Sequence, residues 1–437
     1  MSKGTRSIKI AILGLGVVGN GVLETLTYKK NAFKDQFASE LDVSYILVKD
    51  LNKPRELYSS NALITDDYER ILSDDSVDIV VEVMGGDQPA FDYIKRAMEN
   101  GKSVVTANKE VISKHGQELM SIASINGVHL LFEASVGGGI PIIRPLSKDL
   151  NANDVDAIRS IINGTTNYIL TNMTYMGSTF AEALDEAQTL GYAESDPTND
   201  VEGIDAVYKL SIMASLAFRS QILPQDVYRE GISNLTANDF KYAKELGYVI
   251  KLMAIAKRQD SEIDIRVHPS LLPEEAPLAK VNGVYNAIQV HGDLVGHVLF
   301  HGQGAGGNAT ASAVVGDIID VSGDLVRNAN PVSYIWNGKE SSIRSIAELV
   351  SRYYIRLTVE DRPGVMAKLT DVLGSKAISI ASIIQKESDT SLNSAELVIT
   401  THPSKEADVQ DALNDISELD VVKSIGSIIR IESGSAD

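Results

Sequence analysis

The chain has 437 residues, of which 44% are hydrophobic and 23% are charged, and its formal net charge is −19. A chain of this length exceeds one ordinary core, so we expect two or three domains. The acidic balance argues against nucleic acid and anionic membrane surfaces as partners, because both select clustered Lys and Arg. The absence of cysteine excludes disulfides, thiolate catalysis and Cys-ligated metals. The N-terminal apolar run reads as a strand rather than a signal peptide, and we expect a cytoplasmic protein.

Residues 7–150 alternate short apolar runs with helical segments. The runs of strand length are 8–16, 41–49, 77–85, 102–107 and 127–135, and helical spacing appears at 17–28 and 89–101. Strands that alternate with helices predict an α/β fold with a parallel sheet covered on both faces. We therefore predict a Rossmann-type nucleotide-binding domain over residues 1–150.

The pattern changes after residue 150. Helical segments are predicted at 179–190, 201–219 and 238–257, with β-rich pieces between 261 and 303. This pattern indicates a mixed α+β domain over residues 151–330, followed by a linker at 331–352. Residues 353–432 then show strand, helix, two strands, helix and strand, which is the βαββαβ order of a ferredoxin-like domain.

Gly14, Gly16 and Gly19 have G-x-G-x-x-G spacing within ILGLGVVGNG. An apolar strand precedes the motif and a helical segment follows it, which is the context that dinucleotide binding requires. The glycines permit a tight turn and a close approach to a pyrophosphate at the helix N-terminus. A plain glycine turn is the structural alternative, and the context favours dinucleotide binding.

The residues after the second predicted strand bear on the choice between NAD and NADP. An acidic residue there binds the ribose hydroxyls, whereas a basic residue accommodates a 2′-phosphate. The sequence VKDLNKPRE places Lys49 first and then Asp50, with Lys53 and Arg55 nearby. Lys49 favours NADP, and Asp50 leaves NAD open.

Six further stretches place glycine, asparagine and charged residues near predicted strand and helix ends. They are VEVMGG (81–86), VVTANKE (104–110), FEASVGGGIPII (132–143), INGTTNYIL (162–170), GYAESDPTNDVEGIDAVYKL (191–210) and GQGAGGNATASAVVGDI (302–318). We interpret INGTTNYIL as a polar turn, and each stretch alone is compatible with an ordinary turn. Asp205 and Lys209 lie four residues apart and so project from one face of a helix. As a surface pair they would contribute only about 0.3–0.5 kcal/mol.

In this order the motifs resemble homoserine dehydrogenase over roughly residues 8–330, and residues 353–432 resemble an ACT regulatory domain. The resemblance implies an NAD(P)-dependent oxidoreductase that acts on a CH–OH group. Its reaction would interconvert L-aspartate 4-semialdehyde and L-homoserine in the biosynthesis of threonine, methionine and isoleucine. The resemblance further implies that the domain at 151–330 binds substrate and forms a dimer interface.

The resemblance also implies roles for two lysines. Lys209 would exchange the proton at the reacting oxygen, and Lys109 would hold the substrate near the nicotinamide and share in proton transfer. A lysine pKa of about 10.4 falls beside a second ammonium and rises beside a carboxylate, so the sequence leaves open which lysine dominates. The implied substrate-binding residues, whose carboxylates would face the substrate ammonium, are Glu194, Asp200, Asp205, Lys209, Gly164, Thr165 and Tyr192.

Cofactor and cation sites follow from the same resemblance. The implied NAD(P)-binding residues are Gly14, Gly16, Val17, Val18, Gly19, Lys49, Gly85, Thr106, Lys109, Gly191 and Gly306. The turn EASVGGGI resembles the family's monovalent cation site, in which main-chain carbonyls hold Na⁺. Those carbonyls would belong to Glu133, Val136, Gly138 and Ile140. A glycine turn that only positions Glu133 is the alternative.

The turn EDRPGVMAKL resembles the effector-binding turn of ACT domains. We expect a small amino acid there, threonine being the first candidate, bound at Asp361, Gly364 and Asn393. A dimerisation module without a ligand is the alternative, and the resemblance implies a homodimer or homotetramer. Another class of function stays open, namely a non-catalytic regulator that senses NAD(P) and an amino acid. Lys109 and Lys209 argue against it, because sensing needs neither.

Overall fold

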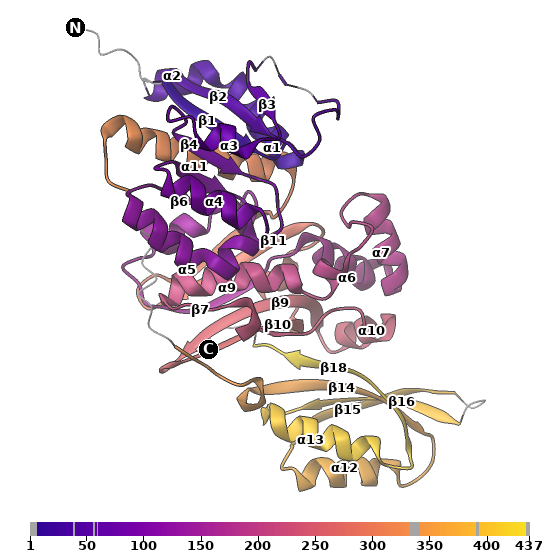
Figure 1. Ribbon diagram of the computed structural model, residues 1–437. Helices are drawn as coiled ribbons and strands as arrows, with labels where there is room; N and C mark the ends of the chain where they lie inside the picture. The colour runs from indigo at the N-terminus through magenta and orange to yellow at the C-terminus, as the bar shows by residue number, and fades with distance from the viewer. Residues whose placement is uncertain are drawn as a thin grey trace. The chain divides into compact units, whose positions relative to one another are not determined.

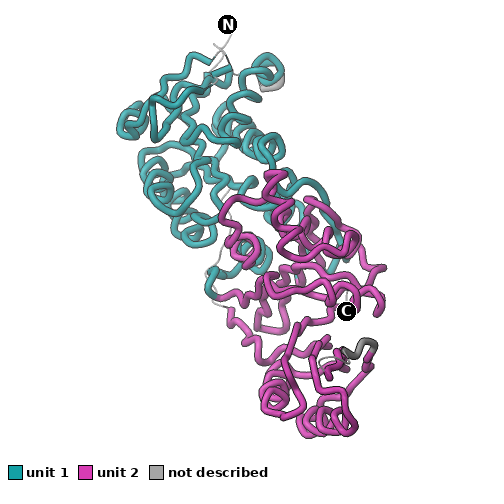
Figure 2. The backbone as a smooth tube through the Cα atoms, turned by 90° about the vertical axis from the view of Figure 1, so that its right-hand side faces the viewer, with its two compact units in different colours: residues 1–155, 208–225, 292–340 teal, residues 156–207, 226–291, 341–437 magenta. Residues whose placement is uncertain are grey.

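The computed structural model describes residues 7–37, 40–55, 57–58, 60–331, 341–389 and 393–433. The chain forms two compact units, each assembled from three separate stretches (Figure 2). Unit 1 comprises residues 1–155, 208–225 and 292–340, and unit 2 comprises residues 156–207, 226–291 and 341–437. Part of the predicted linker, residues 332–340, lies outside the described residues, and the predicted domain bounds stay a prediction.

Unit 1 contains a parallel sheet in the order β3-β2-β1-β4-β5-β6 (Figure 1). Its strands are β1 (Ser7–Leu13), β2 (Glu40–Leu47), β3 (Leu63–Thr65), β4 (Ile79–Glu82), β5 (Ser103–Thr106) and β6 (Leu130–Leu131). This is the doubly wound order of dinucleotide-binding folds, and it confirms the predicted Rossmann-type sheet. The short strand β3 was not among the predicted strands.

Helices cover this sheet, and one of them comes from far along the chain. The helices of unit 1 are α1 (Val17–Tyr28), α2 (Lys30–Phe37), α3 (Tyr68–Leu72), α4 (Ala90–Glu99), α5 (Lys109–Asn126) and α11 (Gly307–Arg327), and the unit also holds β12 (Gly296–Gln303). Helix α11 packs on α1, and its Val314 and Ile318 share one apolar cluster with Ile10 and Ile12 of β1. The apolar face of the sheet at β1 is therefore covered in part by a helix that follows it by about 300 residues in the chain.

Unit 2 is built on a mixed sheet. Its main strands are β7 (Val155–Ile161), β9 (Tyr248–Gln259), β10 (Glu262–Pro273), β11 (Tyr285–Gly292), β14 (Val350–Glu360), β15 (Ile380–Asp389), β16 (Ser394–Thr401) and β18 (Val422–Ile431), and the short strands are β8 (Tyr228–Arg229), β13 (Ser342–Ile343) and β17 (Ser404–Lys405). The order along the sheet is β11-β7-β9-β10-β18-β14-β16-β15. Strands β9 and β10 form a long antiparallel hairpin, which agrees with the predicted α+β character.

The helices of unit 2 differ from the sequence-based expectations at three places. These helices are α6 (Gly164–Met176), α7 (Phe180–Thr189), α8 (Thr198–Val201), α10 (Ala237–Glu245) and the first residues of α9 (Ile204–Phe218), which continues into unit 1. The helix predicted at 238–257 ends at Glu245, because the chain turns at Gly247 with φ +77° and continues as β9. The helix predicted at 201–219 is interrupted at Gly203, where φ is +76°. The predicted polar turn at 162–170 is instead the start of α6.

The C-terminal module, residues 341–433, has the predicted βαββαβ order. Helix α12 (Val365–Ser375) and helix α13 (Glu406–Ser417) pack with strands in the order β18-β14-β16-β15. Strand β18 also pairs in parallel with β10 at Ser270↔Arg430 and Leu271↔Ile431. The module therefore continues the sheet of unit 2 rather than forming a separate one.

Candidate active site

The glycine motif occupies the turn between β1 and α1. Gly14 has φ +99°, and a Cβ at Gly19 would lie 2.2 Å from the carbonyl oxygen of Gly14. Both positions therefore require glycine, the first for its backbone conformation and the second for close packing. A Cβ at Gly16 would meet no atom within 4 Å. Gly16 is the N-cap of α1 and offers no side chain, so there is open space beside this helix N-terminus, where a pyrophosphate can bind.

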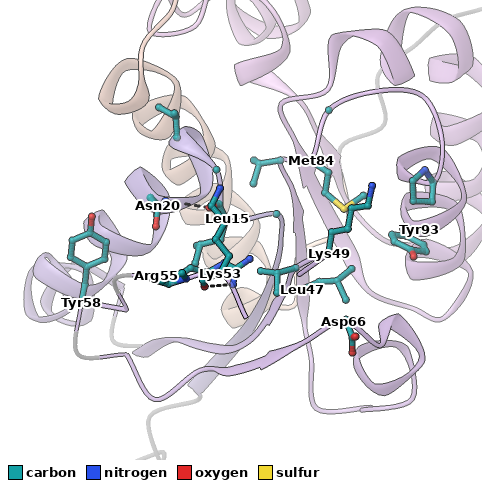
Figure 3. Close-up of a pocket in the computed structure, with 18 residues that line it drawn as sticks. Leu15, Asn20, Leu47, Lys49, Lys53, Arg55, Tyr58, Asp66, Met84 and Tyr93 are labelled. Atoms are coloured by element: carbon teal, nitrogen blue, oxygen red, sulfur yellow. Dashed lines mark hydrogen bonds between the residues drawn. The ribbon is translucent and has the colours of Figure 1, made fainter. Parts of the chain in front are cut away.

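A cavity of about 1130 Å³ opens beside this turn (Figure 3). Its lining includes the glycine turn, the end of β2 and the residues after β4, and three of its side chains are the cations Lys49, Lys53 and Arg55. Arg55 donates to the backbone carbonyls of Lys53 and Asp50, at 2.7 and 2.6 Å. The Asp50 carboxylate accepts the amide of Asn52 at 2.8 Å, so it caps the local turn. This edge of the cavity is therefore cationic.

The second glycine loop lies against the first. A Cβ at Gly307 would lie 3.0 Å from a methyl group of Val17. Gly306, with φ +118°, is the N-cap of α11. The structure thus brings predicted cofactor residues from both ends of unit 1 together, whereas Gly191 belongs to unit 2.

A buried carboxylate organises the strand ends of unit 1. Glu82, at the end of β4, accepts the hydroxyl of Thr106 at 2.6 Å and the amides of Met84 and Gly85 at 2.8 and 3.3 Å. Burial raises the pKa of Glu82, and the hydrogen bond from Thr106 opposes that shift. The motif VEVMGG contains Glu82, but no role for Glu82 was predicted from the sequence. A carboxylate inside an otherwise apolar strand could have indicated such a role.

Asn108 sets the start of helix α5. Its side-chain oxygen caps α5 by accepting the amide of Val111 at 3.2 Å, and its amide group donates to the carbonyl of Gly86 at 2.7 Å. Lys109 is the next residue and the first of the helix. The position of Lys109 therefore depends on an asparagine that sequence reasoning did not single out. A cap residue directly before a helix was the available signal.

Helix α9 carries Asp205 and Lys209 on consecutive turns. Both are buried, with only 4% and 8% of their surfaces exposed. Within unit 1 the ammonium of Lys114 on α5 lies 5.9 Å from the ring centroid of Tyr208 on α9. The helices that carry Lys109 and Lys209 therefore lie side by side (Figure 1). These two buried side chains differ from the solvent-exposed ion pair that the four-residue spacing alone would allow.

Asn163 joins two of the predicted carboxylates in unit 2. Its side-chain amide lies 2.6 Å from an oxygen of Asp200 and 2.9 Å from an oxygen of Asp205. Its side-chain oxygen caps α6 by accepting the amide of Thr166 at 2.8 Å. We call Asn163, Asp200 and Asp205 the carboxylate cluster. Sequence reasoning missed Asn163, although it stands directly before the predicted residues Gly164 and Thr165.

The other predicted substrate residues surround α6 and the loop after α7. Thr165 donates to the carbonyl of Tyr192 at 2.7 Å, and a Cβ at Gly164 would lie 2.9 Å from the carbonyl of Val284. Glu194 is exposed and its main-chain carbonyl accepts from Gln188 at 3.0 Å. The hydrogen bonds of the described residues therefore connect Thr165 with Tyr192, whereas Glu194 is connected to Gln188 near the end of α7.

The glycine turn at 133–140 is held by carboxylates. Glu133 accepts the amides of Ile142, Ile143 and Arg144 at 2.6–2.8 Å. Its own amide donates to Asp317 at 2.8 Å, and burial raises the pKa of Asp317 to about 8. A Cβ at Gly138 would lie 2.5 Å from the carbonyl of Gly304, so this turn also contacts the second glycine loop.

Two of the three predicted effector residues, Asp361 and Asn393, contact each other in the C-terminal module. The amide of Asp361 donates to the carbonyl of Asn393 at 3.3 Å, and Lys423 donates to the same carbonyl at 3.1 Å. Gly364, with φ +88°, is the N-cap of α12.

Over the described ranges, no three His, Asp or Glu side chains gather as a metal-ion site. No helix in the described part of the chain is long and apolar enough to cross a bilayer.

Comparisons with known proteins cover nearly the whole chain. The NAD-binding domain of homoserine dehydrogenase matches residues 14–133, the homoserine dehydrogenase domain matches 141–319, and the ACT domain matches 353–421. A homoserine dehydrogenase of Synechocystis sp. is 43% identical over 98% of this chain and 100% of its own length. The crystal structure of a homoserine dehydrogenase from Thiobacillus denitrificans has a TM-score of 0.92 at 40% identity, covering 99% of this chain and 100% of that one.

One solved structure bears on the cofactor. A hyperthermophilic archaeal homoserine dehydrogenase in complex with NADPH has a TM-score of 0.62 at 29% identity, and the match covers 72% of this chain and 98% of that one. The nucleotide cavity, the buried pair on α9 and the matches over nearly the full length agree with one another. The chain therefore belongs to the homoserine dehydrogenase family, the NAD(P)-dependent oxidoreductases of homoserine.

Proposed function

We propose that this protein interconverts L-homoserine and L-aspartate 4-semialdehyde with NADP, using residues of α5, α6 and α9. The observation that carries the proposal is the burial of Asp205 and Lys209 on consecutive turns of α9. Ionisable side chains are rarely buried without a partner or a function. Asn163 fixes Asp205 within the carboxylate cluster, which leaves a dedicated acidic site rather than a solvated helix face.

The residues divide the work between the two ends of the substrate. The carboxylates of Asp200 and Asp205, with Glu194, bind the substrate ammonium by charge-assisted hydrogen bonds. The nicotinamide of a bound cofactor would supply the hydride acceptor for the carbinol carbon of homoserine. Lys209 takes the hydroxyl proton in that direction and returns it in the other, as a general base and acid. Lys109, at the start of α5, stabilises the negative charge that develops on the oxygen.

NADP is the preferred cofactor in this proposal. The nucleotide cavity presents Lys49, Lys53 and Arg55 where the adenosine ribose would lie, at the end of β2. Asp50 is engaged with the amide of Asn52 in a turn. A cationic edge matches a 2′-phosphate better than a free hydroxyl, because the phosphate is a dianion that Arg and Lys bind strongly.

Three further features belong to the proposal. The carbonyls of Glu133, Val136, Gly138 and Ile140 bind Na⁺, and the left-handed conformation of Gly138 supports a turn that gathers carbonyls. Threonine binds the ACT module at the end that carries Asp361, Gly364 and Asn393 and lowers activity. The protein assembles as a homodimer or homotetramer, and light scattering with chromatography measures that state.

The decisive experiment follows the absorbance of reduced nicotinamide. Purified protein is mixed with homoserine and either NADP or NAD, with and without Na⁺ and threonine. We expect NADP to be reduced only when homoserine is present, faster than NAD, and more slowly with threonine. Protein that binds NADPH but never turns over homoserine would instead be the non-catalytic sensor.

A further inference from the structure

A short loop of unit 2 connects the ACT module to the carboxylate cluster. This junction loop consists of residues 228–233, at and after β8. On the ACT side, Arg430 of β18 donates to the carboxylate of Glu230 at 2.9 Å. The guanidinium carbon of Arg430 also lies 5.3 Å from the ring centroid of Tyr228. A buried arginine of the ACT sheet thus holds the side chain of Glu230, while the loop backbone pairs with β10, where the amide of Glu230 donates to the carbonyl of Val267 at 2.8 Å.

Arg430 itself is fixed by a second carboxylate. Only 2% of its surface is exposed, and it makes two hydrogen bonds to Glu406 of α13, at 2.8 and 2.7 Å. Glu406 in turn accepts the hydroxyl of Tyr353 at 2.8 Å. The charge of Arg430 therefore stays balanced when Glu230 is changed, which lets Glu230 be varied without leaving a bare buried cation.

On its other side the junction loop is bonded to the chain between Asp200 and Asp205. The amide of Ile232 donates to the carbonyl of Val201 at 2.8 Å, and the hydroxyl of Ser233 donates to the carboxylate of Glu202 at 2.8 Å. A Cβ at Gly231 would lie 2.7 Å from the carbonyl of Val201. The loop and this segment approach so closely that a shift of one must move the other.

We propose that Glu230 is a positioning residue through which Arg430 of the ACT module sets the geometry of the carboxylate cluster, and with it the affinity for the substrate ammonium. The chain of contacts runs from Arg430 to Glu230, through the junction loop to residues 201–202, and from there to Asp200 and Asp205. This inference rests on the proposed role of those two carboxylates. Glu230 itself touches no substrate in this account.

The surroundings of Glu230 allow the loop to move. Its side chain is 34% exposed, and a cavity of about 680 Å³ lies between the junction loop and helix α13, with Glu202, Glu230 and Arg430 in its lining. Loss of the Arg430 contact therefore leaves the loop next to open volume rather than against packed side chains. The expected consequence is a looser carboxylate cluster in a folded protein.

The test compares two carboxylate-to-amide variants in the full-length protein. Glu230→Gln removes the negative charge that pairs with Arg430 and leaves at most a neutral hydrogen bond to the junction loop. Glu396→Gln is the matched control, because Glu396 also pairs with a partly buried arginine, Arg356, at 2.8 Å. Glu396 contacts Asn238 of α10 at 3.2 Å instead of the junction loop. Both variants thus lose one ion pair of the ACT module.

For Glu230→Gln we expect the KM for homoserine to rise about tenfold, with kcat, the KM for NADP and the melting temperature unchanged. Glu396→Gln should leave the KM for homoserine unchanged, and Glu230→Asp should restore part of the affinity. Equal effects of both amide variants, or a homoserine KM within twofold of the wild type for Glu230→Gln, would overturn the inference.

A second measurement does not depend on turnover. Amide hydrogen exchange of peptides covering residues 198–207 should be faster in Glu230→Gln than in the wild type and in Glu396→Gln. Faster exchange in a protein that shows no homoserine turnover would leave the link standing and remove the proposed function. Unchanged exchange in this segment would overturn the link itself.

Discussion

The sheets of the two units are stabilised by different interactions. In unit 1 the sheet core is apolar, with Ile10, Ile12, Val81 and Val105 fully buried. Its binding groups are backbone amides and glycines at strand ends. In unit 2 the sheet interior contains ion pairs: Arg266 with Glu432 at 2.8 Å, Arg356 with Asp239 at 2.7 Å and Arg430 with Glu406 at 2.7 Å.

The two kinds of core differ in which substitutions they accept. Apolar strands pack with many partners of similar volume, whereas a buried charge requires one partner at one place. Burial alone raises the pKa of Glu432, but the charges of Arg266 and Lys257 outweigh it and lower the pKa to about 2. Loss of one member of these pairs in unit 2 therefore leaves its partner as an unmatched buried charge.

The largest expected effect concerns the catalytic helix. Lys209→Ala should lower turnover of homoserine by about 10²- to 10⁴-fold, because it removes the proposed general base and acid, and it should leave NADPH binding intact. Steady-state kinetics and fluorescence titration with NADPH measure the two quantities. Lys114→Ala is the control, because Lys114 lies beside α9 but is paired with Glu110 and Asp87. Turnover within tenfold of the wild type for Lys209→Ala would contradict the assignment.

The ion pairs of unit 2 should dominate stability. Asp239 has no exposed surface and accepts Arg356, Ser427 and Thr236, so Asp239→Ala should lower the free energy of unfolding by about 3–5 kcal/mol. Urea unfolding followed by circular dichroism measures the loss. Lys34→Ala, which removes an exposed pair in unit 1, should leave the midpoint unchanged. Similar urea unfolding midpoints for both variants would contradict the proposal that the buried ion pairs of unit 2 contribute more to stability than the exposed pair of unit 1.

Cofactor choice should depend on the cationic edge of unit 1. The double variant Lys49→Ala/Arg55→Ala should raise the KM for NADP about tenfold and leave the KM for NAD unchanged, because only NADP carries the 2′-phosphate. Asp50→Asn should change neither value if Asp50 serves only as a turn cap. An increase confined to NAD in Asp50→Asn would show that this carboxylate reads the ribose.

Two buried titratable groups should give pH dependences of opposite sign. Burial raises the pKa of Asp317 in unit 1 to about 8, so the folded state keeps a proton that the unfolded state loses, and stability falls as pH rises from about 4 to 8. Burial lowers the pKa of Lys251 in unit 2 to about 7, so the unfolded state binds more protons and stability rises above pH 7.

Variants isolate the two contributions. Asp317→Asn should flatten the fall in unfolding free energy between pH 5 and 8, and Lys251→Met should flatten the rise between pH 7 and 10. Both are measured by urea unfolding across the pH series. Slopes that match the wild type in either variant would show that the corresponding group titrates alike in the folded and unfolded states.

Local patterns determined much of this protein. The βαβ alternation, the glycine motif and the βαββαβ module are written in consecutive residues, because backbone conformation and hydrophobic periodicity act over short stretches. The roles of Lys109, Asp205 and Lys209 were predicted from the resemblance of the motifs to a known family. The prediction from local patterns was wrong at 238–257, where a strand that is buried on both faces has no alternation to distinguish it from a helix.

Tertiary structure decided which distant residues meet. Asn163 reaches Asp200 and Asp205 about forty residues away, and Arg430 reaches Glu230 across 200 residues. The return of α11 to the nucleotide sheet is of the same kind. No periodicity encodes such pairs, because a charge or an amide can find its partner anywhere that the fold brings one within hydrogen-bond distance. The sequence therefore determined the elements and the candidate lysines, and the fold alone decided what holds the carboxylates in place.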